Sequence, residues 1–82
     1  MVKENLYLTI TKVDGPVFDG EAISVTVPGA DGEMTVLAHH EAFISPLRSG
    51  KITVHKTDES EESFEVESGT IEVSNNQATL MI

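Results

Sequence analysis

The stretch AISVTVPGADGEMTVL, residues 22–37, decides the fold class of this chain. Ile23, Val25 and Val27 alternate with small or polar residues, which is the period-two pattern of a β-strand with one buried face. The segment 28–32, rich in proline and glycine, then predicts a turn, and a second strand-like segment follows it. Two such segments on either side of a short glycine-containing turn predict a β-hairpin.

Strand-like periodicity extends outward from this hairpin over almost the whole chain. Leu6, Leu8 and Ile10 mark an earlier strand, which ends at the turn signal DGP in residues 14–16. A later strand contains Pro46, which favours an edge strand or a bulged one because proline cannot donate to a ladder. Short strands at regular spacing predict an all-β fold, a two-sheet β-sandwich of about nine or ten short strands.

The expected core consists of side chains that point inward from both sheets. These side chains are Leu6, Leu8, Ile10, Phe18, Ile23, Val25, Val27, Val36, Ile52, Val54, Phe64, Val66, Ile71, Val73 and Leu80. Asp19-Gly20 and Ser68-Gly69 predict turns in which glycine supplies a positive φ. A last turn is expected at Asn75-Asn76.

Length and composition favour a single domain over residues 1–82. A chain of 82 residues buries only about 60–65% of its unfolded surface, so its stability margin is small. The sequence has no cysteine, which fits a reducing cytosolic environment. Its apolar runs are too short to insert into a bilayer, and the polar segment 1–5 does not resemble a signal peptide.

The charge balance excludes some classes of partner. The chain has 14 acidic and 5 basic side chains, which give a formal net charge of −9. Nucleic acids and anionic membrane surfaces are therefore not expected to bind. The basic residues are Lys3, Lys12, Arg48, Lys51 and Lys56. Basic protein surfaces are the natural partners of such a charge.

No catalytic, cofactor-binding or metal-binding site is predicted. His39 and His40 are adjacent, so a regular strand would point them to opposite faces, and zinc sites need three or four converging ligands. One of these histidines is expected to pack at the base of its loop and the other to be exposed. The acidic run 58–62 lacks the spacing of a calcium-binding loop. No glycine-rich loop leads into a helix that could hold a phosphate.

Four short motifs occur in one order and at one spacing. They are VFDGEA (17–22), GEMTVLAHH (32–40), SGTIEV (68–73) and NQATL (76–80). Together they resemble the N-terminal β-sandwich domain of the F-type ATP synthase epsilon subunit. That family's pattern is V-F-x-G, then G-E-x-x-x-L-x-x-H, then G-G-x-x-E-V and a T-V-L strand. The resemblance runs from about Leu6 to the last residue. It implies a form that lacks the family's C-terminal helical hairpin, either a naturally short epsilon subunit or a truncated one.

The resemblance also implies a function and a set of partner-binding positions. It implies a non-catalytic central-stalk subunit that docks on the gamma subunit and the c-ring and couples proton transport to ATP synthesis. The beta subunit is a third candidate partner, and the expected location is peripheral, on the cytoplasmic face of a bacterial plasma membrane. The positions that match the family's contacts are Gly32 and Glu33 at the ring-facing turn, His40 on the next loop, Ser45 near gamma and Lys12 at the end of the first strand.

The chain departs from the family pattern around His40. His39 replaces the glycine that usually precedes the loop histidine, and Glu41-Ala42 replaces Ala-Pro. The loop is therefore expected to be less flexible than in the family. Ser68 replaces the first of the paired glycines, while Gly69 and Glu72 match positions that have an architectural role.

Two other classes of protein fit the sequence less well than an epsilon subunit does. The first is a generic β-sandwich module for ligand binding or adhesion, which often presents an exposed aromatic platform. This chain offers only Tyr7 beside three phenylalanines that are expected to be buried. The second is a small cupin-like metalloenzyme, which would need more than the three histidines present.

Overall fold

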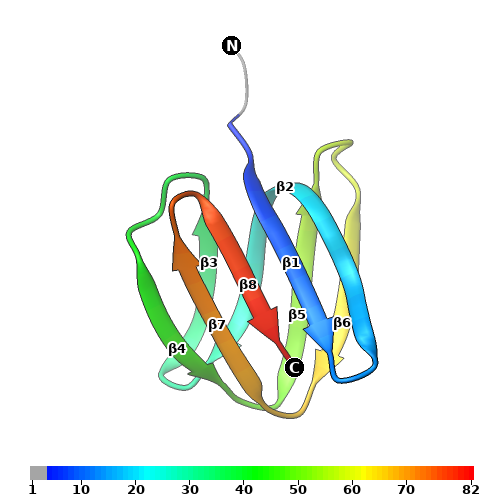
Figure 1. Ribbon diagram of the computed structural model, residues 1–82, viewed down its shortest axis with the longest axis vertical. Coiled ribbons are helices and arrows are strands. Elements are labelled where there is room, and N and C mark those ends of the chain that lie inside the picture. Colours follow the sequence, from blue (N-terminus) through cyan, green and yellow to red (C-terminus); the bar gives the residue numbers. More distant parts are fainter. Residues whose placement is uncertain (1–3) are drawn as a thin grey trace.

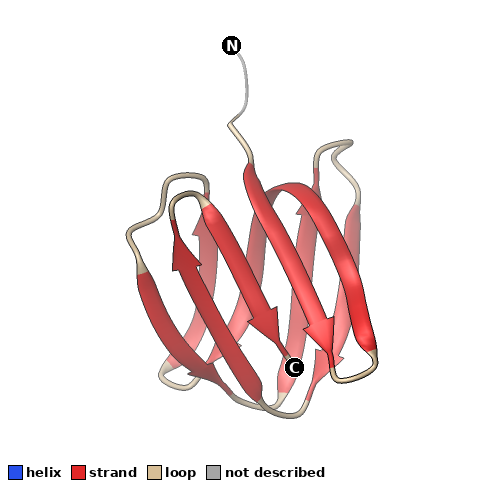
Figure 2. Cartoon of the chain, viewed as in Figure 1, coloured by secondary structure: helices blue, strands red, loops and turns tan. Residues whose placement is uncertain are grey.

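The computed structural model describes residues 4–82 and is all-β (Figures 1 and 2). Its eight strands are β1 Leu6–Lys12, β2 Gly15–Gly29, β3 Gly32–Leu37, β4 Phe43–Leu47, β5 Gly50–Lys56, β6 Glu61–Val66, β7 Gly69–Ser74 and β8 Gln77–Met81. Within this part of the chain we find no helix that is long and apolar enough to cross a membrane. Residues 1–3, which include Lys3 and the start of the polar segment 1–5, lie outside the described residues.

The strands lie in two layers, which confirms the predicted sandwich (Figure 1). The front sheet has the order β4-β7-β8-β1 and ends with the first half of β2. The back sheet has the order β3, the second half of β2, β5 and β6. Strands β1 and β8 are parallel, and the other pairs are antiparallel. The inward-facing side chains of the two sheets form one core between them.

Strand β2 joins the two sheets, and here the sequence-based prediction of a turn at Asp19-Gly20 is wrong. β2 is 15 residues long and continues through Gly20, which pairs with Leu8 of β1. It then bends over one end of the sandwich, as Figure 1 shows, and descends in the back sheet beside β3 and β5. Two expected strands are therefore one, and the sandwich has eight strands where about nine or ten were expected.

Ile23 lies where β2 passes between the sheets. The pairing with β5 shifts between Ala22 and Ser24, so Ile23 is the extra residue of a β-bulge. A bulge moves the alternation by one position, which buries Ala22 and Ser24 and leaves Ile23 only half-buried. The prediction of Ile23 as a core residue was therefore wrong.

The rest of the core agrees closely with the inward-facing pattern. All other predicted core residues are buried except Phe18 and Phe64, which pack against the margin of the core. Leu47, Ala22 and Ala78 are buried as well.

The structure confirms the predicted turn at Asn75-Asn76 but not the positive φ expected at Gly20 and Gly69. Asn75 (φ 50°) and Asn76 (φ 59°) form the predicted turn between β7 and β8. Among the described glycines, only Gly15 and Gly32 have a positive φ. Gly69 therefore does not supply the positive φ that its position after Ser68 suggested. A Cβ at Gly69 would instead lie 2.3 Å from the carbonyl oxygen of Met81, so the close approach of strand β8 requires glycine here.

Strand β4 occupies the edge position that Pro46 predicted. It pairs with β7 along its whole length, but on its other side it meets β2 only at the pair Leu47–Gly29. The carbonyl of Pro46 accepts a hydrogen bond from the N–H of Ala30 at 3.0 Å. Proline thus lies where its missing N–H leaves no gap in a central ladder.

Candidate partner-binding surfaces

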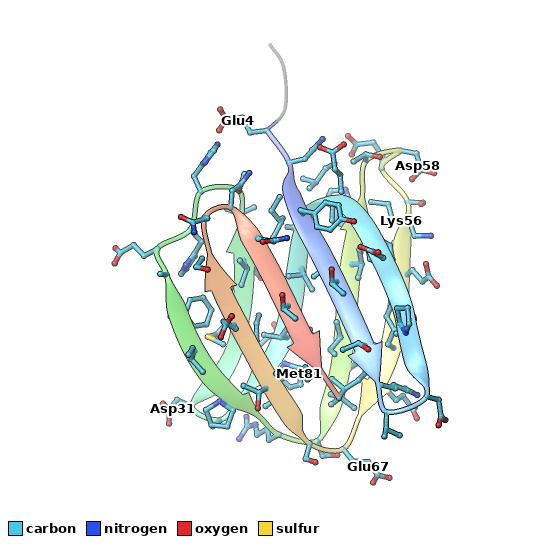
Figure 3. The ribbon with its side chains drawn as sticks, viewed as in Figure 1. Glu4, Asp31, Lys56, Asp58, Glu67 and Met81 are labelled. Carbon is cyan, nitrogen blue, oxygen red and sulfur yellow. The ribbon has the colours of Figure 1, made fainter. Side chains whose placement is uncertain are left out.

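The expected partner-binding residues lie at two opposite ends of the sandwich. The lower end in Figure 1 carries the turns at 13–14, 30–31, 48–49 and 67–68, and the upper end carries the loop 38–42 and the turns at 57–60 and 75–76. Figure 3 labels Asp31 and Glu67 at the lower end, and Glu4 and Asp58 at the upper end.

Gly32 and Glu33 belong to the lower end. The pair Gly29–Gly32 closes a two-residue hairpin turn, and the φ of Gly32 (134°) is one that side chains rarely adopt. Glu33 pairs with Pro28 across the hairpin and is exposed, so its carboxylate is available to a partner. Lys12, the last residue of β1, is also exposed at this end. This end therefore combines charges of both signs.

His40 belongs to the upper end, so the structure does not bring it together with Glu33. Glu33 is the second residue of β3 and His40 lies beyond its other end, and the part of β3 from Glu33 to Leu37 alone spans about 13 Å at about 3.3 Å per residue. The His40 ring packs on Phe43 with centroids 5.0 Å apart, and its Nδ1 donates to the carbonyl of Glu41 at 2.9 Å. That contact fits the expected packing at the loop base, but His40 and His39 are both exposed.

His39 adopts the backbone conformation for which the family's glycine is suited. Its φ is 63°, and its Nε2 lies 3.2 Å from the Glu4 carboxylate. Its N–H donates to the side-chain oxygen of Asn76 at 2.8 Å. No group of three or more potential metal ligands occurs among residues 4–82. The contacts of His39 and His40 therefore stabilise the conformation of the loop. The described residues contain no metal-binding cluster of which these histidines could be part.

Ser45 is half-buried near the middle of β4 and does not lie on the outer face of the front sheet. Its partner across the ladder is the buried residue Ile71, so both side chains point toward the interior. The Ser45 hydroxyl donates to the carbonyl of Pro46 at 3.0 Å.

The outer face of the front sheet carries few charged residues. One row across it contains no charged residue and consists of Pro46, Thr70, Met81, Thr11 and Pro16. The adjacent row consists of Ile44, Glu72, Thr79, Thr9 and Asp19. The outer face of the back sheet also has an uncharged row, which consists of Thr35, Thr26, Thr53 and Ser63. Its neighbouring rows, however, place Lys51 opposite Glu65 and His55 opposite Glu61.

Large apolar side chains are exposed on this front face. Ile44 is 69% exposed, Met81 51% and Tyr7 40%. A shallow hollow beside Ile44 is lined by Phe43, Glu72 and their neighbours. The Tyr7 hydroxyl donates to the Asp19 carboxylate, and this hydrogen bond is the main cause that raises the pKa of Tyr7.

Sequence reasoning did not include Ile44 and Met81 among the partner-binding residues, although a signal was present. Both alternate with inward-facing neighbours, Ile44 with the half-buried Phe43 and Met81 with the buried Leu80. An apolar residue on the solvent side of a strand is unexceptional by itself. Only the pairing of β4, β7 and β8 brings these residues onto one face.

Relatives of known family align with most of this chain. The model of the ATP synthase delta/epsilon chain β-sandwich domain family matches residues 5–82. The ATP synthase epsilon chain of Sulfurimonas denitrificans is 39% identical over 77 residues, which cover 94% of this chain and 59% of that one. The epsilon chain of Protochlamydia amoebophila is 43% identical over 74 residues, with 90% and 50% covered. That of Chlorobium limicola is 42% identical over 64 residues, with 78% and 73% covered.

Solved structures share the fold. A chain of the Euglena gracilis mitochondrial ATP synthase OSCP/F1/c-ring assembly superposes with a TM-score of 0.90 at 22% identity, covering 99% of this chain and 52% of that one. A chain of the Tetrahymena thermophila central stalk/c-ring structure gives 0.79 at 11% identity, with 99% and 65% covered. The chain spans about 50–59% of the length of the first two epsilon chains. The family match over residues 5–82 shows that this chain belongs to the ATP synthase delta/epsilon chain β-sandwich domain family.

Proposed function

We propose that this chain acts as a central-stalk subunit of an F-type ATP synthase and has no catalytic role of its own. In this role it docks on the gamma subunit and the c-ring and helps to couple proton transport to ATP synthesis. The observation that carries the proposal is the family match together with relatives that are ATP synthase epsilon chains. The same match disfavours a generic ligand-binding or adhesion module. The chain would lie peripherally, at the cytoplasmic face of a bacterial plasma membrane.

The outer face of the front sheet is the surface we assign to the gamma subunit. Protein interfaces have few charged residues at their centre and are enriched in methionine and aromatic residues. The uncharged row around Met81, with Ile44 and Tyr7 nearby, meets this description. The loop that carries His40, and the open β4 edge beside Ser45, border this face and extend the same contact.

The lower end is the surface we assign to the c-ring. Gly32 fixes the hairpin turn there, and Glu33 and Lys12 are exposed beside it. Such charges at the rim of an interface act through screened Coulomb interactions, which steer association and fix orientation. This assignment separates the two partners by the length of the sandwich. That separation agrees with the positions of Glu33, near the start of β3, and His40, beyond its other end.

Removing the exposed apolar side chains of the front face is expected to weaken binding to gamma. The double variant Ile44→Ser/Met81→Ser should raise the Kd for gamma by about 30-fold, equivalent to about 2 kcal/mol, because apolar anchors dominate interface energetics. Leu37→Ser is the matched control, since Leu37 is 56% exposed but lies on the outer face of the back sheet. Calorimetry measures both affinities. An unchanged Kd for the double variant, or an equal loss for Leu37→Ser, contradicts docking through this face.

Glu33 is expected to act on c-ring docking and not on the fold. Glu33→Gln should change the free energy of unfolding by no more than about 0.5 kcal/mol, because the side chain is exposed. Glu33→Lys should reduce proton-pumping coupling in the reassembled enzyme more than Glu33→Gln, since it turns attraction into repulsion, and salt should diminish the difference. Thermal melting and proton pumping measure the two effects. Wild-type coupling of both variants at low salt contradicts the ring contact, and a loss of several degrees in Tm would make Glu33 a structural residue.

A further inference from the structure

Asn76 connects three segments that are distant in the sequence. Its side-chain Oδ1 accepts a hydrogen bond from the N–H of His39 at 2.8 Å. Its Nδ2 donates to the carbonyl of Asn5 at 2.9 Å, and its own carbonyl accepts from the N–H of Tyr7 at 3.1 Å. The chemistry fixes the orientation of the amide, because the N–H of His39 needs an acceptor and the carbonyl of Asn5 needs a donor.

These hydrogen bonds connect the loop 38–42, through Asn76, to the start of strand β1. His39 has a φ of 63°, a conformation that is unfavourable for a residue with a Cβ, so the loop needs compensating contacts. The hydrogen bond from the His39 N–H to the Asn76 side chain supplies one, and the 3.2 Å contact between His39 and Glu4 supplies another. Where the family has a flexible glycine, this chain has a histidine that Asn76 holds in place.

We propose that Asn76 is a positioning residue for the loop 38–42, and that it presents His40 and Glu41 to the gamma subunit in a fixed conformation. The inference rests on the proposed docking of this loop on gamma. A loop that is already ordered loses less conformational freedom when it binds, so its affinity is higher. Asn76 is half-buried beneath the loop and acts through the His39 backbone.

The neighbouring Asn75 provides a matched control. Asn75 also has a positive φ (50°), it lies in the same turn and it is exposed. Its side chain makes no hydrogen bond with another described residue. Glycine tolerates a positive φ, so Asn76→Gly and Asn75→Gly both preserve the backbone of the turn. Only Asn76→Gly removes the two side-chain bonds to His39 and Asn5.

The first test is amide hydrogen exchange followed by NMR. Asn76→Gly should accelerate exchange at the N–H of His39 by at least about tenfold, because local opening no longer breaks a hydrogen bond. Asn75→Gly should leave that rate unchanged. Asn76→Asp should restore slow exchange only in part, since its carboxylate can accept from the His39 N–H but cannot donate to the Asn5 carbonyl. Unchanged exchange in Asn76→Gly, or equal acceleration in Asn75→Gly, overturns the proposal.

The second test is calorimetric binding to the gamma subunit. Asn76→Gly should weaken binding by about tenfold, Asn75→Gly should not, and Asn76→Asp should recover part of the loss. The loss should disappear in a His40→Ala background if Asn76 acts through the loop, whereas a general structural effect would persist there. Accelerated exchange with wild-type affinity overturns the positioning role. If the wild-type chain does not bind gamma, the proposed function fails, and the exchange test still decides whether Asn76 orders the loop.

Discussion

Gly69→Ala is expected to destabilise the sandwich by about 3 kcal/mol or more, which is near the upper limit for overpacking in a protein core. The added Cβ would lie 2.3 Å from the carbonyl oxygen of Met81 and 3.1 Å from the Cα of Ile82. Both are backbone atoms, so strand β8 itself would have to move. In a domain of this size such a loss corresponds to a decrease in Tm of at least about 12 °C. Thermal melting by circular dichroism measures it.

Gly20→Ala is the matched control for this substitution. Gly20 also lies within a strand and lacks a positive φ, but no atom lies within 4 Å of the position of its added Cβ. Replacing a strand glycine without a clash should be neutral or slightly stabilising, because alanine restricts the unfolded chain more. Equal Tm values for the two variants would show that the approach of β8 to Gly69 is not tight.

The contrast between Gly69 and Gly20 shows what the sequence could predict about the fold. Alternation of apolar residues identified the strands and most of the core, because a two-layer sandwich imposes a period of two on every strand. The same local rules read Gly20 and Gly69 as turn residues. In the structure one lies inside a continuous strand, and the other lies against a strand that is close in space. Contacts between strands decide such positions, and these contacts are not visible in a local window.

Ile23 illustrates the same limit in the core. Alternation within residues 22–27 predicted that Ile23 points inward, together with Val25 and Val27. The bulge where β2 leaves the front sheet inserts one residue and reverses the direction of the side chain. A strand of ordinary length would not need to change sheets, so the 15-residue β2 is both the cause of the error and the feature that closes the sandwich.

The candidate binding surfaces were predictable only in part. Exposure of Glu33 followed from its place beside a turn glycine, and the structure shows it exposed. The separation of Glu33 from His40 follows from the length of β3. The front face around Met81 and the bonds of Asn76 depend on the pairing of β8 with β7 and β1, which brings distant segments together. Motif spacing contains no direct information on that pairing.

Leu8→Ala is expected to destabilise the fold by about 3 kcal/mol, within the range measured for truncation of buried leucines. Leu8 is fully buried in the middle of β1. Its neighbours across the two adjacent ladders are Gly20 and Ala78, which are too small to fill the space that the leucine leaves. The cavity should therefore persist and add its own cost to the lost transfer free energy.

Leu37→Ala removes the same atoms from a side chain that is 56% exposed, so it serves as the matched control for Leu8→Ala and should cost less than about 1 kcal/mol. Urea unfolding measures both variants, and Leu8→Ala should lower the midpoint without changing the m-value, because the extent of surface exposed on unfolding stays the same. If the two alanine variants have equal midpoints, Leu8 does not lie in a tightly packed core. If the m-value of Leu8→Ala falls, the variant unfolds through a partly structured state, and the two sheets then separate in more than one step.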